Sequence, residues 1–141
     1  MRLVLDTSVI VSALRSKLGA SNALLLLAYR NRIRLLVSPP LFLEYEDVLL
    51  RPEQRLVHGL SVIAVNGFLG DLTTCIEPVE IHFKWRPQLI DPGDEMVLEA
   101  AINGRAEALV THNIKHFALP AQRFGILALT PQELLRSLPN E

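Results

Sequence analysis

The sequence predicts an α/β fold in which a mostly parallel sheet lies between two layers of helices. Short apolar segments alternate along the chain with longer segments of helical pattern, as in parallel sheets covered on both faces. Half of the residues are hydrophobic and 21% are charged, which is typical of a chain with a packed core. Its 141 residues contain no repeat and no linker, so we expect a single domain over residues 1–141.

Four short apolar segments are the predicted strands of this sheet. They comprise residues 3–5, 34–38, 108–110 and 126–128. A fifth segment, 76–81, contains a proline, which cannot donate to a strand ladder and therefore restricts this segment to an edge of the sheet.

Capping residues and helix-breaking residues in the sequence predict helices between the strands. Thr7 or Ser8 can cap the first helix, and Asp94 stands at the start of a later one that Gly104 follows. The first helix is expected to end at residue 14. The later helices are expected over residues 23–30, 41–50, 94–103 and 131–138. In the middle, 53–58 and 61–72 are weaker candidates, because glycines lower the helix propensity of the second.

Composition excludes several classes of protein. The net charge of −1 argues against a domain that binds nucleic acid through bulk positive charge. A single cysteine, Cys75, excludes an internal disulfide and a cysteine zinc site. No secretion signal is visible, and the longest apolar stretch, residues 23–29, is too short to span a bilayer. We therefore expect a cytoplasmic protein without a membrane segment.

Side chains that can bind a metal ion follow several of the predicted strands. Asp6 comes directly after the first strand, and Glu44 lies about one turn into the helix after the second. Asp94 opens the helix before the third strand, and Asn113 follows that strand. Ligands bind outside the carboxyl ends of parallel strands, so we expect these side chains to lie together. Their oxygens suit hard cations such as Mg²⁺.

Each of these residues also has an ordinary structural explanation. Asp6 and Asp94 could cap helices, Glu44 could be a solvated helix residue, and Asn113 could occupy a turn. What favours a metal site is their joint position at one end of one sheet.

Four segments, in order along nearly the whole chain, resemble the motifs of the PIN domain family. They are residues 3–9, 38–45, 91–101 and 109–117. The resemblance implies the PIN fold and hydrolysis of RNA, with Mg²⁺ or Mn²⁺ held by Asp6, Glu44 and Asp94 and assisted by Asn113. The most similar branch is the VapC toxins, which implies a small antitoxin partner.

Further residues within these motifs are expected to support the site. Ser8 and Thr111 could orient Asp6 and the fourth motif, and Ser8 could also offer a backbone N–H to a phosphate. Lys115 and His116 could contact phosphate, and His116 could instead act in proton transfer or be a partly exposed loop histidine. Many family members carry an aspartate where this chain has Asn113; the neutral amide lowers the expected affinity for a second ion.

Other charged residues lie near these motifs along the chain. Asp91 and Glu95 are close enough to Asp94 to join the site through water, although Glu95 points about 100° away around the helix. Arg15 and Lys17 are candidate partners of the RNA backbone. A second basic group is expected to be a solvated surface: Arg30, Arg32 and Arg34.

Three alternative classes of protein also have acidic residues at such a sheet edge. A haloacid-dehalogenase-type fold needs an aspartate at position 8, where this chain has Ser8, and a receiver domain needs one after residue 37. The serious rival is a PIN-like protein that has lost catalysis and acts as a binding module, which Asn113 favours and the three carboxylates oppose.

Two leucine-rich helices, at 24–27 and 134–138, could form a homodimer face, although core burial explains such leucines more often.

Overall fold

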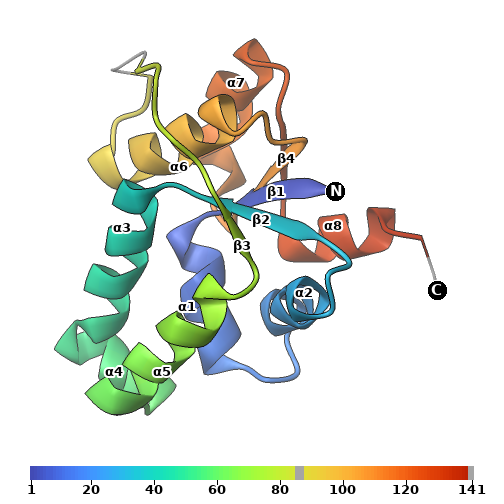
Figure 1. Ribbon diagram of the computed structural model, residues 1–141. Helices are drawn as coiled ribbons and strands as arrows, with labels where there is room; N and C mark the ends of the chain where they lie inside the picture. Colours follow the sequence, from blue (N-terminus) through green and yellow to red (C-terminus); the bar gives the residue numbers. More distant parts are fainter. Residues whose placement is uncertain (85–87, 140–141) are drawn as a thin grey trace.

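The computed structural model describes residues 1–84 and 88–139, and within them five strands form one parallel sheet (Figure 1). The order across the sheet is β3-β2-β1-β4-β5, with every pairing parallel. The strands are β1 (Arg2–Leu5), β2 (Arg34–Val37), β3 (Ile76–Pro78), β4 (Ala108–Val110) and β5 (Leu127–Leu129). The predicted α/β fold is thereby confirmed, including the proline-containing strand at an edge.

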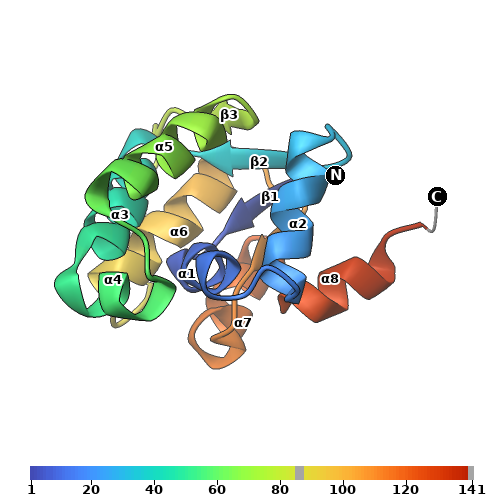
Figure 2. The same cartoon turned by 90° about the horizontal axis from the view of Figure 1, so that it is seen from below.

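Helices cover both faces of the sheet. In Figure 1, α1, α2 and α8 lie on one face and α6 and α7 on the other, while α3, α4 and α5 pack beside α1 at the carboxyl side of the strands, as Figure 2 also shows. The described helices are α1 (Thr7–Arg15), α2 (Ala20–Tyr29), α3 (Pro39–Leu50), α4 (Pro52–His58), α5 (Val62–Thr73), α6 (Pro92–Asn103), α7 (Ile114–Arg123) and α8 (Pro131–Ser137).

The register of the two central strands aligns their carboxyl ends. Leu5 pairs with Val110, and the next residue, Asp6, donates its backbone N–H to the Val110 carbonyl at 2.8 Å. Asp6 and Thr111, one residue beyond each strand, therefore emerge side by side. This register is what brings the first and fourth sequence motifs together.

The core is mainly aliphatic, with Tyr45 and Phe117 as its largest fully buried side chains. The Tyr45 hydroxyl donates a hydrogen bond to the Leu5 carbonyl, which ties α3 to the end of β1. Burial, followed by the nearby charge of Asp6, raises the pKa of this phenol well above its ordinary value. Tyr45 thus stays protonated and holds its neighbour on the helix, Glu44, close to the end of β1.

Helix α7 was not expected from the sequence. Pro120 lies inside it, and a proline removes one backbone donor and usually breaks a helix. Phe117 and Ala121, four residues apart and both buried, nevertheless pack one face of this helix into the core. Tertiary packing therefore outweighs the local penalty of the proline.

Several helix starts differ from the expected ones: α2 begins at Ala20 instead of residue 23, and α3 begins at Pro39 instead of residue 41. Asp6, rather than Thr7 or Ser8, occupies the N-cap position of α1. Helix α6 begins two residues earlier than predicted, at Pro92, and its cap is Asp91, whose side chain accepts the Gly93 N–H at 2.7 Å. Asp94 is consequently a residue of the first turn and is not the cap.

The leucines of the two helices considered for a dimer face mostly serve the core. Leu24, Leu25 and Leu134 are buried, and the partly buried Leu135 and Leu138 pack against the core.

Among the described residues, no single helix has both the length and the apolar composition to cross a membrane. Two pairs of helices, α1 with α2 and α4 with α5, have that length and composition only when the two members are counted together, and each pair is sharply bent.

Candidate metal-binding cleft

Asp6 stands at the end of β1 and is held by two hydroxyl groups. Its Oδ2 accepts hydrogen bonds from Ser8 Oγ at 2.8 Å and from Thr111 Oγ1 at 2.7 Å. Although Asp6 occupies the N-cap position, its side chain accepts no bond from the helix backbone. This buried carboxylate lines a cleft at the carboxyl edge of the sheet.

Glu44 reaches the same cleft from α3. The Ser38 hydroxyl caps this helix by accepting the Leu41 N–H, and two prolines in its first turn start it directly after β2. Partial burial raises the pKa of the half-buried Glu44 carboxyl, and the negative charges of Asp47, Asp91 and Asp6 raise it further, against the opposing effect of Arg51.

Gly93 allows Glu44 to approach the start of α6. A Cβ atom at this position would lie 3.2 Å from Glu44 Oε1 and 3.2 Å from Asp91 Oδ1, which is tighter than ordinary contact. The absence of a side chain at Gly93 therefore lets two carboxylates meet at the N-terminus of the helix.

Asp94 is the third carboxylate in the cleft and lies in the first turn of α6. Burial raises its pKa, and the charges of Asp6 and Asp91 raise it further, while His116 acts in the opposite direction. His116 Nδ1 lies 3.2 Å from Asp94 Oδ2. Asp6 and Asp91 thus act electrostatically on Asp94 and on Glu44 alike.

These side chains line one cleft of about 550 Å³ at the carboxyl edge of the sheet. Its walls include Asp6, Glu44, Asp91 and Asp94, together with Ser8, Arg15 and His112. Within residues 1–84 and 88–139, however, no three His, Cys, Asp or Glu side chains gather closely enough to form a ready-made metal site. Mg²⁺ usually takes only one or two protein carboxylates and keeps several waters, so this donor set fits such an ion.

The remaining predicted site residues take different positions. Thr111 is fully buried beneath Asp6. Lys115 and His116 line a neighbouring groove that also includes Asp94. Asn113 is exposed, lies outside the cleft-lining residues, and donates its backbone N–H to Thr111 Oγ1 at 2.9 Å. Its assistance to a metal ion stays a prediction.

Glu95 is turned away from the cleft. Its carboxylate is buried, and Oε1 accepts the backbone N–H groups of Gln88 at 2.7 Å and Leu89 at 2.8 Å. It therefore anchors the segment before α6, whereas Asp91 is the extra acid that lines the cleft.

Gln54 and His112 are among the cleft residues that the sequence did not single out. His112 follows β4 within the fourth motif, and its Nε2 lies 3.1 Å from the hydroxyl of Ser21. Its place directly after Thr111 was the signal that could have identified it. Gln54 reaches the cleft from α4, which no sequence motif indicated.

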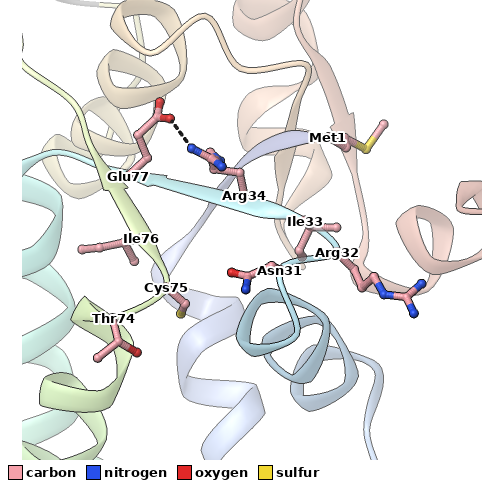
Figure 3. Close-up of a pocket in the computed structure, with 9 residues that line it drawn as sticks. All are labelled: Met1, Asn31, Arg32, Ile33, Arg34, Thr74, Cys75, Ile76 and Glu77. Carbon is pink, nitrogen blue, oxygen red and sulfur yellow. Dashed lines mark hydrogen bonds and ion pairs between the residues drawn. The ribbon is translucent and has the colours of Figure 1, made fainter.

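A second cavity, of about 340 Å³, lies at the amino ends of β2 and β3 and has a different character (Figure 3). Its acid, Glu77, forms ion pairs with Arg34 at 3.1 Å and with Arg2 at 2.7 Å. Burial alone would raise the pKa of Glu77, but the hydrogen bonds from these arginines lower it. Arg32 also lines this cavity, so the basic group predicted near residues 30–34 lies at the end of the sheet away from the carboxylates.

The family model for the PIN domain matches residues 2–115, which includes both central strands and all four acidic cleft residues. The chain belongs to the PIN domain family. PIN domains are generally nucleases and generally use divalent metal ions. No curated protein matches the chain.

Solved structures show the same PIN fold. One is a chain of the crystal structure of VapBC2 from Rickettsia felis bound to a DNA fragment from their promoter, with TM-score 0.62, 20% identity, and coverage of 91% of this chain and 97% of that chain. Another is a chain of VapBC-1 from nontypeable Haemophilus influenzae, with TM-score 0.62, 16% identity, and coverage of 94% and 99%. This PIN domain therefore resembles VapC in fold.

Proposed function

We propose that this PIN domain is a metal-dependent endoribonuclease and the toxin of a toxin–antitoxin pair. In this proposal Asp6, Glu44 and Asp94 bind Mg²⁺ or Mn²⁺, and Asn113 assists. The substrate is RNA, and residues 1–141 act as one cytoplasmic domain.

The observation that carries the proposal is the common cleft of the three carboxylates. Burial raises the pKa values of Glu44 and Asp94, and the negative charges of Asp6 and Asp91 raise both further. A divalent cation would relieve the repulsion, since an opposite charge nearby favours the ionised form of a carboxyl group. The fold alone supports only the family; the cleft supports the chemistry.

The chain's own groups have clear tasks in phosphodiester hydrolysis. A bound Mg²⁺ or Mn²⁺ supplies a water of lowered pKa and neutralises charge that builds on the phosphate. Thr111 and Ser8 hold the Asp6 carboxylate in one orientation. Arg15, which lines the cleft and contacts Gln54 at 3.2 Å, offers a guanidinium group to a phosphate of the RNA.

The partner of the proposed toxin is a small antitoxin protein. Both solved structures named above are VapBC complexes, which supports an antitoxin partner for a chain of the same fold. A homodimer is also part of the proposal. The exposed leucine Leu26 on α2 gives such a dimer an apolar contact.

Cleavage of a defined RNA pool with Mg²⁺ or Mn²⁺ tests the function. We expect wild-type protein to cut RNA only when the metal is added, and Asp6→Asn and Asp94→Asn to lose at least about tenfold in rate, as expected for disruption of a metal site. Asp71→Asn is the matched control, because it neutralises an exposed aspartate on α5 outside the cleft. Undiminished cutting by both cleft variants would show that the site is wrong.

The second candidate function is a binding module without catalysis. It is favoured by Asn113 in place of an acid and by the spacing of the described acids, which do not form a ready-made metal site. The two functions differ in the response of thermal stability to millimolar Mn²⁺. A wild-type Tm that Mn²⁺ leaves unchanged favours the binding module, whereas a rise that Asp6→Asn removes favours the nuclease.

A further inference from the structure

A groove of about 650 Å³ adjoins the acidic cleft on the far side of Asp91 and Asp94. It runs between the segment 88–91 and helix α7. Asp91 and Asp94 line both the cleft and the groove, so a strand of substrate in the cleft can continue directly into it.

Hydrogen bonds hold the wall formed by residues 88 and 89 from two sides. The buried Glu95 carboxylate accepts the N–H groups of Gln88 and Leu89, which fixes their backbone to α6. Arg123, at the end of α7, donates to Gln88 Oε1 at 3.2 Å. The groove is therefore built by contacts with both helices that flank it.

The lining of the groove combines an apolar surface with positive charge. Leu89, Ile90 and Pro120 provide the apolar part, and the Ile90 side chain is fully exposed at 104%. Lys115 and His116 project from the first turn of α7, and the His116 side chain is 58% exposed. The Lys115 ammonium group is the complement of a phosphate, although Asp91 and Asp94 also bring negative charge to the groove, and the apolar surface is the complement of a base ring.

We propose that this groove binds the nucleotide next to the scissile phosphate of single-stranded RNA. Lys115 contacts a backbone phosphate, and Leu89, Ile90 and Pro120 contact the base. This inference rests on the proposed ribonuclease function and adds to it a subsite outside the carboxylate cleft. Base contact through aliphatic groups tolerates every base, so the groove contributes affinity more than sequence selectivity.

Equilibrium binding of a fluorescently labelled single-stranded oligoribonucleotide tests the subsite. The protein carries Asp6→Asn, which slows cleavage, and the assay contains EDTA in place of Mn²⁺ so that the RNA stays intact. We expect Lys115→Ala to weaken binding about fivefold and to reduce the slope of log affinity against log salt by about 0.7, since one phosphate contact is lost. Ile90→Ser should weaken binding about threefold and leave that slope unchanged, because it removes an uncharged contact.

Matched controls separate these effects from general changes in charge or hydrophobicity. Arg30→Ala removes an exposed cation next to α2 at the other end of the sheet, and Ile63→Ser replaces an exposed isoleucine on α5. Both should bind the RNA within twofold of the Asp6→Asn parent.

The outcomes also separate the subsite from the proposed function. If wild-type protein cuts no RNA, the function is wrong while the binding comparison still stands. If Lys115→Ala and Ile90→Ser bind RNA as tightly as the parent, the subsite is wrong.

Discussion

The hydroxyl of Thr111 donates a 2.7 Å hydrogen bond to Oδ2 of Asp6 and so connects the ends of β4 and β1. The same hydroxyl oxygen accepts the backbone N–H of Asn113, which leads into α7. One buried side chain therefore orients the first carboxylate of the cleft and positions the helix that carries Lys115 and His116.

Thr111→Val should weaken both folding and metal binding. A hydrogen bond to a charged group contributes about 1.5–3 kcal/mol, so we expect a loss of that order in the free energy of unfolding, measured by urea denaturation. Because Asp6 also loses its orientation, the affinity for Mn²⁺ should fall at least about tenfold. Thr111→Ser keeps the hydroxyl and should restore metal affinity; an equal loss in both variants would contradict this role.

Asp94→Asn should raise Tm in the absence of divalent ions. The pKa of Asp94 is raised in the folded protein, so its contribution to stability is present at low pH and is lost as the pH rises through the folded pKa. At neutral pH the charge thus opposes folding, and its removal should raise Tm by about 1–3 °C in EDTA. Mn²⁺ should then stabilise wild type more than the variant. A lower Tm of Asp94→Asn in EDTA, with Asp71→Asn unchanged, would contradict the repulsion.

The stabilisation by Mn²⁺ should decline at a higher pH than for ordinary carboxylates. If Glu44 and Asp94 bind the metal as proposed, protons compete with it for these carboxylates, whose pKa values are raised mainly by burial and then by neighbouring acids. We therefore expect the Mn²⁺-induced rise in Tm to fall off already above the range of about pH 3.9–4.3 in which free Asp and Glu protonate. A rise in Tm that persists unchanged down to pH 4 would be incompatible with these ligands.

Gly93→Ala should separate metal binding from folding. The added Cβ lies 3.2 Å from both Glu44 Oε1 and Asp91 Oδ1, so these carboxylates must move by a few tenths of an ångström. Alanine favours a helix by about 1 kcal/mol over glycine, which offsets the strain. We expect unfolding in EDTA to be unchanged or slightly stabilised and the Mn²⁺ effect on Tm to be reduced. Full retention of the Mn²⁺ effect would contradict the idea that metal binding requires the close packing of Glu44 and Asp91 against Gly93.

Glu95→Ala should destabilise the protein by about 2 kcal/mol, because two backbone N–H groups lose a charged acceptor. Urea denaturation measures this loss. Glu133→Ala, which removes an exposed capping carboxylate on α8, is the comparison and should lose about 1 kcal/mol or less. Equal losses in the free energy of unfolding would mean that the buried hydrogen bonds of Glu95 stabilise the protein no more than the exposed cap of Glu133 does.

Local signals in the sequence determined much of the fold. Short apolar runs such as residues 3–5 and 108–110 favour strands covered on both faces, and prolines and polar caps indicate where helices start. The α7 helix escaped prediction because Pro120 contradicts it locally, while the burial of Phe117 and Ala121 that stabilises it exists only in the folded chain.

The sequence by itself also identified Asp6, Glu44 and Asp94 as the acidic residues of the motifs, since their residue types and order along the chain need no coordinates. Only the tertiary structure decided how they meet. Strand register put Thr111 beside Asp6, and close packing at Gly93 put Asp91 next to Glu44, whereas Asn113 fell outside the cleft and Glu95 turned to anchor a loop. Such outcomes depend on contacts between residues far apart in the chain, which spacing along the sequence does not contain.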